Sequence, residues 1–292
     1  MNRSIHHEFV ALDEGLGTVL HVDERDQRRN WLLPLGHEQP RDMQLVGCGR
    51  VLIGHHHGYT EFDLATGARV KELASLKGVT SVRRLPNGHT RLAGVNLLDA
   101  TGVVLAELDA QDRVIEKQVL EGDYVRLMRE TAAGTFLMMC NTRIRETDRA
   151  GKTLRELPVE GFLHAWKALR RPDGTIISSA GYGAFMVELD PNGRELRRFG
   201  GKGQVPEAVH PFFYAMFQLL PNGDVVVVNW QDHGPGHGAA GVQLLQFNPA
   251  GEIVWQWNEP ALISSLQGVI VLDGLDVSKL HDERDGVMAP LC

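Results

Sequence analysis

Several residue patterns are absent from this chain of 292 residues, and each absence excludes a class of protein. No uninterrupted apolar run approaches the roughly 18 residues that a membrane-spanning helix needs. Lysine and arginine do not predominate, since the formal net charge at pH 7 is -7. Nucleic acids and anionic membranes both favour basic protein surfaces. We therefore expect neither nucleic acid nor a membrane as a partner.

Cysteine is scarce: Cys48, Cys140 and Cys292 are the only three, and their spacing suggests no pairing. Cys48 and Cys140 lie in or beside strand-like apolar runs, so we expect both to be buried thiols. The N-terminal segment lacks the apolar stretch of a signal peptide. A cytoplasmic location is the expectation for this sequence, and a periplasmic one would apply if a leader had been removed.

A short repeat occurs six times along almost the whole chain. In each copy an Asp or Asn is followed, three or four residues later, by Gly or a second polar residue, between two strand-like runs. Successive copies begin 40, 46, 39, 42 and 58 residues apart. A period near 40 residues, with short strands and tight turns, is typical of a β-propeller with one four-stranded blade per repeat. The copies are Asp23–Asp26, Asp63–Gly67, Asp109–Asp112, Asp148–Gly151, Asp190–Gly193 and Asn248–Gly251.

The sixth repeat is split between the two ends of the chain. Residues 266–274 resemble a first strand with its turn, and three further strand-like runs lie near the N-terminus, at residues 8–12, 17–22 and 30–35. We therefore predict an all-β fold: a single six-bladed β-propeller domain over residues 1–292. Pairing of the N-terminal strands with the C-terminal strand would close the ring and remove open sheet edges. Residues 275–292 are expected to pack as a charged C-terminal tail.

One face of the predicted ring carries the long loops. Strand direction alternates within a blade, so the connections between second and third strands, and between successive blades, share this face. The 58-residue spacing arises from two insertions there, residues 200–211 and 231–241. Long loops on a rigid scaffold tend to carry functional sites. We expect the site at the mouth of the central channel on this face.

Histidine is frequent on the same face. Imidazoles from several blades could each supply one neutral nitrogen ligand to a metal ion, and Gln231 could add an oxygen. We predict a divalent ion, with Mn, Zn, Ca and Ni left open. The alternative is that these histidines separately bond loop backbone or line a wet channel. The predicted metal ligands are His56, His210, Gln231, His233 and His237.

Arg41 and Arg126 are candidate binding residues at the channel mouth. A guanidinium matches a carboxylate with two parallel hydrogen bonds, so either arginine suits a carboxylated substrate. The alternative for both is a buried pair with Asp42 or Asp123.

Side chains for proton transfer and stacking complete the candidate site. His164, Tyr124 and Tyr182 are the candidate catalytic acids and bases. Three aromatic residues are candidates for stacking on a substrate ring, with the inter-blade core as their alternative place: Trp166, Tyr214 and Trp230.

Two resemblances to known families bear on function. Leu85–Gly88, Leu220–Gly223 and Asn248–Trp255 resemble repeats of PQQ-like and arylsulfotransferase-like bacterial propellers. The quinoproteins of that group carry a Trp in nearly every repeat, whereas here only Trp255 fills that position, so no quinone cofactor is expected. In residue type, Gln231, His233 and His237 resemble the ligands of oligogalacturonate lyases. Those propellers hold a divalent metal with three histidines and a glutamine and cleave uronates by β-elimination.

These features together predict a metal-assisted lyase that acts on a small-molecule substrate, a carbohydrate or a similar carboxylated compound. The metal and an arginine would stabilise the enolate-like charge that develops on proton loss. Two alternatives stay open: a hydrolase that uses the same metal site, and a non-catalytic propeller that binds a ligand or a partner protein.

Deletion of residues 1–35 tests the predicted closure of the ring. We expect the truncated protein to fail to fold, because the deletion takes three strands out of a closed sheet. Circular dichroism and thermal melting of the purified fragment measure this. A soluble fragment with a cooperative melting transition would contradict the split sixth blade.

Overall fold

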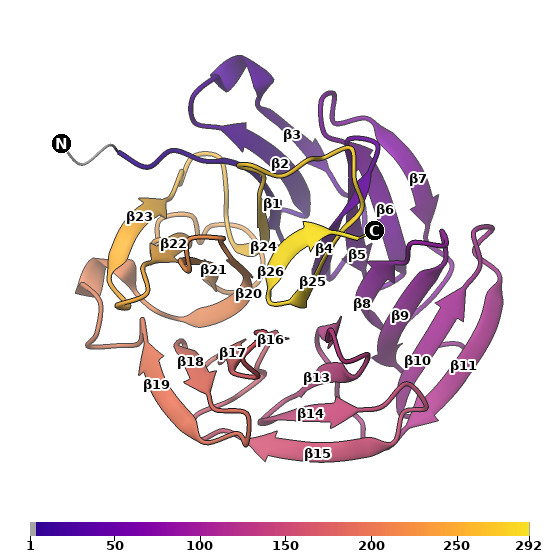
Figure 1. Cartoon of the computed structure of the whole chain (residues 1–292). Helices are drawn as coiled ribbons and strands as arrows, with labels where there is room; N and C mark the ends of the chain where they lie inside the picture. Colours follow the sequence, from indigo (N-terminus) through magenta and orange to yellow (C-terminus); the bar gives the residue numbers. More distant parts are fainter. Residues whose placement is uncertain (1–3, 292) are drawn as a thin grey trace.

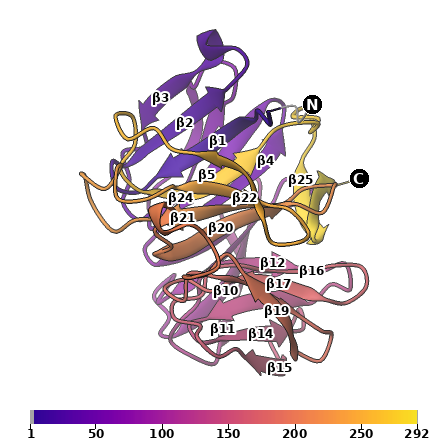
Figure 2. The ribbon, with the colours of Figure 1, turned by 90° about the vertical axis from the view of Figure 1, so that its left-hand side faces the viewer.

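The computed structural model describes residues 4–291, which form six four-stranded antiparallel blades around a central axis, one of them extended to a six-stranded sheet (Figure 1). The predicted six-bladed β-propeller is confirmed. Strands β3 (Trp31–Pro34) and β15 (Thr153–Pro158) lie at opposite edges of the ring (Figure 2). In the described part of the chain, helices are limited to two short 3-10 turns, η1 (Gln27–Arg29) and η2 (Glu207–Val209). None of the helices between residues 4 and 291 has the length and apolarity needed to cross a bilayer.

In every blade the first strand lies nearest the axis and the fourth lies at the rim. The first strands are β4 (Asp42–Gly47), β8 (Val79–Arg84), β12 (Met128–Glu130), β16 (Ala168–Arg170), β20 (Phe213–Leu219) and β24 (Leu266–Val271). The second strands are β5 (Arg50–His55), β9 (Thr90–Val95), β13 (Phe136–Cys140), β17 (Ile176–Ser179), β21 (Val225–Trp230) and β1 (Glu8–Asp13). The third strands are β6 (Gly58–Asp63), β10 (Val103–Leu108), β14 (Arg143–Thr147), β18 (Met186–Leu189), β22 (Leu244–Phe247) and β2 (Thr18–Asp23). The fourth strands are β7 (Arg69–Leu73), β11 (Val114–Leu120), β15, β19 (Glu195–Phe199), β23 (Ile253–Trp257) and β3.

Apolar clusters between neighbouring blades hold the ring together. One cluster joins Ile144 of β14 to Val187 of β18, and another joins Ile177 of β17 to Phe217 of β20. Both faces of the inner strands are covered in this way, which explains why these strands are apolar almost throughout. Burial of apolar surface stabilises such packing by about 25 cal/mol per Å².

The repeated Asp/Asn motif forms the turn between the third and fourth strands. The Asp190 carboxylate accepts hydrogen bonds from the backbone N–H groups of Asn192 and Arg194, at 2.8 and 2.9 Å. Gly193 then has φ 89, a conformation that glycine adopts without steric cost. An Asp or Asn side chain that caps its own turn is the physical reason for the repeat.

The ring closes as predicted. Strand β24 pairs antiparallel with β1, with Phe9 opposite Val271 and Val10 opposite Ile270. Strands β2 and β3 complete the same sheet. The sixth blade therefore joins both ends of the chain.

The C-terminal segment differs from the charged tail that the sequence predicted. Strands β25 (His281–Asp285) and β26 (Val287–Pro290) form a hairpin that lies inside the ring, drawn in yellow near the centre of Figure 1. Val287 pairs with Leu219 of β20, and Leu280 forms a bridge with Val46 of β4. Its charged sequence does not resemble a buried strand, so the pattern of apolar residues gave no sign of it.

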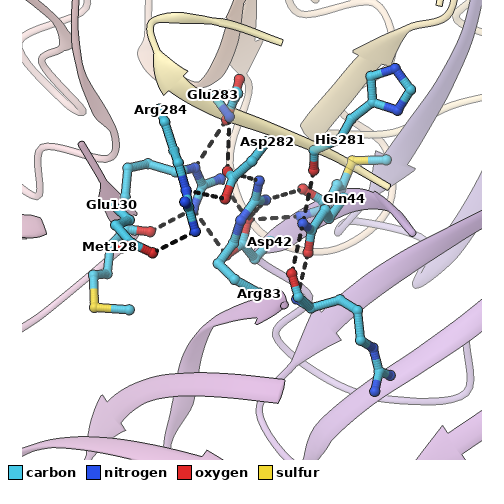
Figure 3. A network of polar contacts seen from close by, with 12 residues as sticks. Asp42, Gln44, Arg83, Met128, Glu130, His281, Asp282, Glu283 and Arg284 are labelled. Carbon is cyan, nitrogen blue, oxygen red and sulfur yellow. Dashed lines mark hydrogen bonds and ion pairs between the residues drawn. The ribbon is translucent and has the colours of Figure 1, made fainter. Parts of the chain in front are cut away.

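The hairpin carries two carboxylates into a buried charge network around the axis. Glu283 accepts hydrogen bonds from Arg129 Nε at 3.0 Å and from Lys167 Nζ at 2.6 Å. Asp282 and Glu283 lie close to Asp42 and Arg83 (Figure 3). Three cations and three carboxylates thus balance in charge, each at most 4% exposed: Asp42, Arg83, Arg129, Lys167, Asp282 and Glu283. We call these six residues the axial network.

One smaller prediction is wrong: Cys48 is exposed, whereas Cys140 is buried as expected. Cys48 has φ 52 and lies in the tight turn between β4 and β5, outside the apolar part of either strand.

His7 forms a buried contact next to the ring closure and gives a test by pH. Its Nδ1 lies 2.5 Å from Asp273 Oδ2 and its Nε2 lies 2.6 Å from Gln246 Oε1, so both ring nitrogens face acceptors. Burial opposes the charged form, but the hydrogen bonds to Asp273 and Gln246 outweigh it and raise the pKa of His7. A raised pKa stabilises the fold below the unfolded value, near about 6.5, and this contribution is lost as pH rises through the folded pKa.

We therefore expect the free energy of unfolding to decrease as pH rises above about 6.5. Replacement of His7 by Gln should remove the contribution of His7 to this decrease. Denaturant titrations at a series of pH values measure the free energy of unfolding. The matched control is His6→Gln, because His6 is exposed. An unchanged pH profile in H7Q would contradict a charged His7.

Candidate functional site

A cavity of about 220 Å³ opens at the channel mouth, on the face that the sequence predicted. Its lining side chains come from five blades, at the starts of first strands and in loops that follow second strands. Seven of the predicted residues line it: Arg41, Arg126, His164, Trp166, Tyr182, Trp230 and His233. The other lining residues are Glu14, Gln39, Phe213 and Gln267.

Two arginines face this cavity without a carboxylate partner among the described residues 4–291. Arg41 donates to Gln39 Oε1 at 2.7 Å, and Arg126 Nε donates to the Tyr124 hydroxyl at 2.6 Å. Burial, reinforced by Arg126, lowers the pKa of Arg41 to about 9. The pair with Asp42 that the sequence left open does not form, because Arg129 binds that carboxylate. Two guanidiniums that repel each other in one cavity favour binding of an anion.

Tyr124 and His164 form a hydrogen-bonded pair beside Arg126. The Tyr124 hydroxyl accepts from Arg126, so its own proton is directed to His164 Nδ1 at 2.7 Å. Burial and the charge of Arg126 lower the pKa of His164, which favours a neutral imidazole. Burial raises the pKa of Tyr124. We infer that the neutral His164 carries its proton on Nε2.

Glu14 orients His233, and both residues line the cavity. His233 Nδ1 lies 2.8 Å from Glu14 Oε1, and Trp230 Nε1 donates to Glu14 Oε2 at 3.2 Å. The His233 ring also packs edge to face on Trp230, with centroids 4.6 Å apart. A carboxylate that accepts from Nδ1 fixes the tautomer with a lone pair on Nε2, as in the histidine of a catalytic triad. His233 is thus arranged to accept a proton.

Aromatic rings form the apolar side of the cavity. Phe213 contacts Tyr182, Trp166 and Trp230 edge to face, with centroids 4.8 to 5.6 Å apart. The Arg126 guanidinium lies over Trp166, 5.1 Å from the ring centroid. This cluster is rigid and holds Arg126 in place by a cation–π contact.

His164 occupies a strained backbone position. Its φ is 54, and its N–H donates to Asn141 Oδ1 at 2.8 Å. Opposite it, Gly181 approaches so closely that a Cβ atom would lie 2.3 Å from the Leu163 carbonyl oxygen, so only glycine fits. Non-glycine residues with positive φ are uncommon and tend to occur at functional positions.

The predicted metal ligands do not form a ligand group. Between residues 4 and 291, no three or more His, Cys, Asp or Glu side chains are arranged to hold one metal ion. His210 Nδ1 bonds the side-chain oxygen of Gln231, and His237 Nε2 bonds the His233 carbonyl. His56 lies outside the cavity lining and packs on His57. The His237 contact matches the alternative that the histidines bond loop backbone.

The structure also corrects the prediction that Tyr214 stacks on a substrate ring. It is fully buried, its hydroxyl donates to the Gly200 carbonyl at 2.5 Å, and its ring packs on Phe247. A bulge in β20 after Tyr214 shifts the register, and the ring lies in the inter-blade core, where it cannot contact a ligand.

The sequence analysis did not name four of the lining residues: Glu14, Gln39, Phe213 and Gln267. Glu14 lies in the loop between β1 and β2, which follows the second strand of the split blade. The sequence analysis searched the loops between second and third strands for site residues. The same search in this loop would have found Glu14. Gln39 lies between two blades and carries no comparable signal.

Comparison with solved structures agrees with the fold. A protein of unknown function from Bacteroides caccae is 18% identical over 91% of this chain and 99% of its own, with a TM-score of 0.74. Streptogramin B lyase is 11% identical over 93% of this chain and 95% of its own, with a TM-score of 0.56. A catalytically inactive histidine-to-alanine variant of virginiamycin B lyase from Staphylococcus aureus, solved with quinupristin, is 10% identical over 88% of this chain and 86% of its own, with a TM-score of 0.55.

Likenesses at these identities establish a β-propeller and no finer grouping. No protein-family model matches the chain, and no curated protein matches its sequence. The resemblance to PQQ-like and arylsulfotransferase-like repeats therefore stays a prediction.

Small carboxylates should bind between Arg41 and Arg126. We expect malonate to bind the wild type, and R41Q or R126Q to weaken binding at least about tenfold, since one charge-assisted hydrogen bond contributes about 1.5–3 kcal/mol. Isothermal titration calorimetry at constant ionic strength measures the Kd. The control is R113Q, because Arg113 is exposed and already paired with Asp109. Equal affinities in all four proteins would rule out an arginine site for anions.

Proposed function

We propose that this propeller is a lyase that acts on a small carboxylated molecule, such as a uronate, at the channel mouth. The observation that carries the proposal is a single cavity lined both by two arginines that have no carboxylate partner among residues 4–291 and by a histidine oriented by Glu14. The similarity in fold to streptogramin B lyase is consistent with lyase chemistry on such a scaffold.

In the proposed reaction, Arg41 and Arg126 bind the substrate carboxylate. Their charges acidify the neighbouring C–H bond and stabilise the enolate-like charge that develops as the proton leaves. His233 Nε2 accepts that proton, and Glu14 stabilises the imidazolium that results.

The elimination is completed by loss of the group on the next carbon. The C–H electron pair becomes the new double bond, the bond to the leaving group breaks, and the leaving group takes a proton from His164 Nε2. The Tyr124 proton then moves to His164 Nδ1, and the tyrosinate lies beside Arg126. Each proton transfer thus has a named donor and acceptor.

The two arginines take the role that the sequence analysis gave to a metal ion. Because the predicted ligands bond to one another and to loop backbone, they do not fit one coordination sphere. The proposed mechanism therefore has no metal-dependent step.

Substitution of the proposed base should slow turnover more than binding. We expect H233Q to lower kcat about 100- to 10,000-fold, the usual range for a general base, with little change in KM. R126Q should raise KM and also lower kcat, because Arg126 binds the ground-state carboxylate and stabilises the charge that develops in the transition state. The assay follows the ultraviolet absorbance of the new conjugated double bond over a panel of uronates and other β-substituted carboxylates.

The control for this experiment is H6Q, because His6 is exposed and does not line the cavity. Full activity in H233Q would remove His233 from the mechanism. Malonate binding without turnover of any β-substituted carboxylate would favour the non-catalytic ligand-binding propeller.

A further inference from the structure

The axial network lies next to the cavity in three places along the chain. Arg41 lines the cavity and the following residue, Asp42, belongs to the network. Trp166 lines the cavity and Lys167 belongs to the network. Arg126 is followed three residues later by Arg129. The same short segments therefore carry both sets of side chains.

Hydrogen bonds of the axial network hold the backbone of these segments in place. Asp42 accepts hydrogen bonds from Ser81 Oγ at 2.6 Å and from the Val82 N–H at 3.0 Å, while Arg129 donates to both of its oxygens. Lys167 Nζ donates to the Phe217 carbonyl at 2.7 Å as well as to Glu283. These bonds link the five blades whose first strands are β4, β8, β12, β16 and β20.

The C-terminal hairpin supplies two of the three negative charges of the network. Without Asp282 and Glu283, the cations Arg83, Arg129 and Lys167 would have Asp42 as their one network carboxylate. Uncompensated buried cations repel one another and draw in water. The strand starts that carry Arg41 and Trp166 would then lose their anchor.

We propose that the C-terminal hairpin positions the ligand cavity: Glu283, through Lys167 and Arg129, holds the segments that carry Trp166, Arg126 and Arg41. Glu283, Asp282, Lys167 and Asp42 are thus positioning residues, and ligand binding at the mouth is coupled to the seating of the hairpin. Coupling of this kind is reciprocal, so a bound anion also protects the hairpin. The inference depends on the cavity being a ligand site and not on the lyase chemistry.

Amide hydrogen exchange tests the proposal without a ligand. The variant is E283Q, which keeps the shape of the side chain and removes its charge. We expect exchange in residues 41–43 and 163–168 to accelerate at least tenfold, together with exchange in the hairpin. The matched control is E146Q, because Glu146 also pairs with two cations, Arg155 and Arg170, away from the cavity. E146Q should leave both segments unchanged.

Faster exchange confined to the hairpin in E283Q would overturn the proposal, as would the same acceleration at the cavity in E146Q. If E283Q does not fold, D282N removes the charge that pairs with Arg83 and, at a longer distance, with Arg284. It is judged by the same two criteria.

Malonate tests the reciprocal effect. We expect it to bind E283Q at least fivefold more weakly than wild type and to slow hairpin exchange in the wild type. E283D restores the charge and should recover part of the affinity, which a purely structural loss of stability would not predict. Unchanged malonate affinity in E283Q would overturn the coupling even if the lyase proposal held. Normal coupling without turnover would refute the lyase proposal alone.

Discussion

Neutralisation of buried charge around the propeller axis is the constraint on which the rest of the structure depends. Arg83, Arg129 and Lys167 project into a channel from which water is largely excluded, and each has a carboxylate partner within 3.0 Å or less. Removal of one partner from such a pair costs about 3–5 kcal/mol, because the other charge stays buried. The chain meets this requirement by returning its C-terminal hairpin into the ring after the sixth blade has closed.

The balanced charges of the axial network explain why, among the described residues, the cavity at the channel mouth carries unpaired positive charge. The network cations use the carboxylates of Asp42, Asp282 and Glu283. Within residues 4–291, the guanidinium groups of Arg41 and Arg126 at the mouth therefore have no such partner. Burial lowers the pKa of Arg41 to about 9, a sign that its charge is costly where it lies. A bound carboxylate would relieve that cost, since an opposite charge stabilises the charged form of a buried group. The cavity is therefore suited to an anionic ligand.

The features that depend on local pattern could be read from the sequence. The Asp/Asn turn motif fixed the number of blades, because a self-capping turn needs only neighbouring residues. Strand alternation placed Arg41, Arg126 and His164 on one face. The hairpin could not be predicted, since its strands are buried by charge pairing with residues 116 to 199 positions away. The predicted metal ligands do not come together because a shared face does not fix where side chains point: His210 bonds Gln231, and His237 bonds the His233 carbonyl.

A crystal structure of the wild type grown with malonate tests the central claim most directly. The account predicts a carboxylate group bridging the Arg41 and Arg126 guanidiniums, with the Glu14–His233 pair on the opposite side of the bound molecule and the hairpin seated as described. Arg41 and Arg126 paired with protein carboxylates, or malonate bound elsewhere while the cavity holds none, would contradict it.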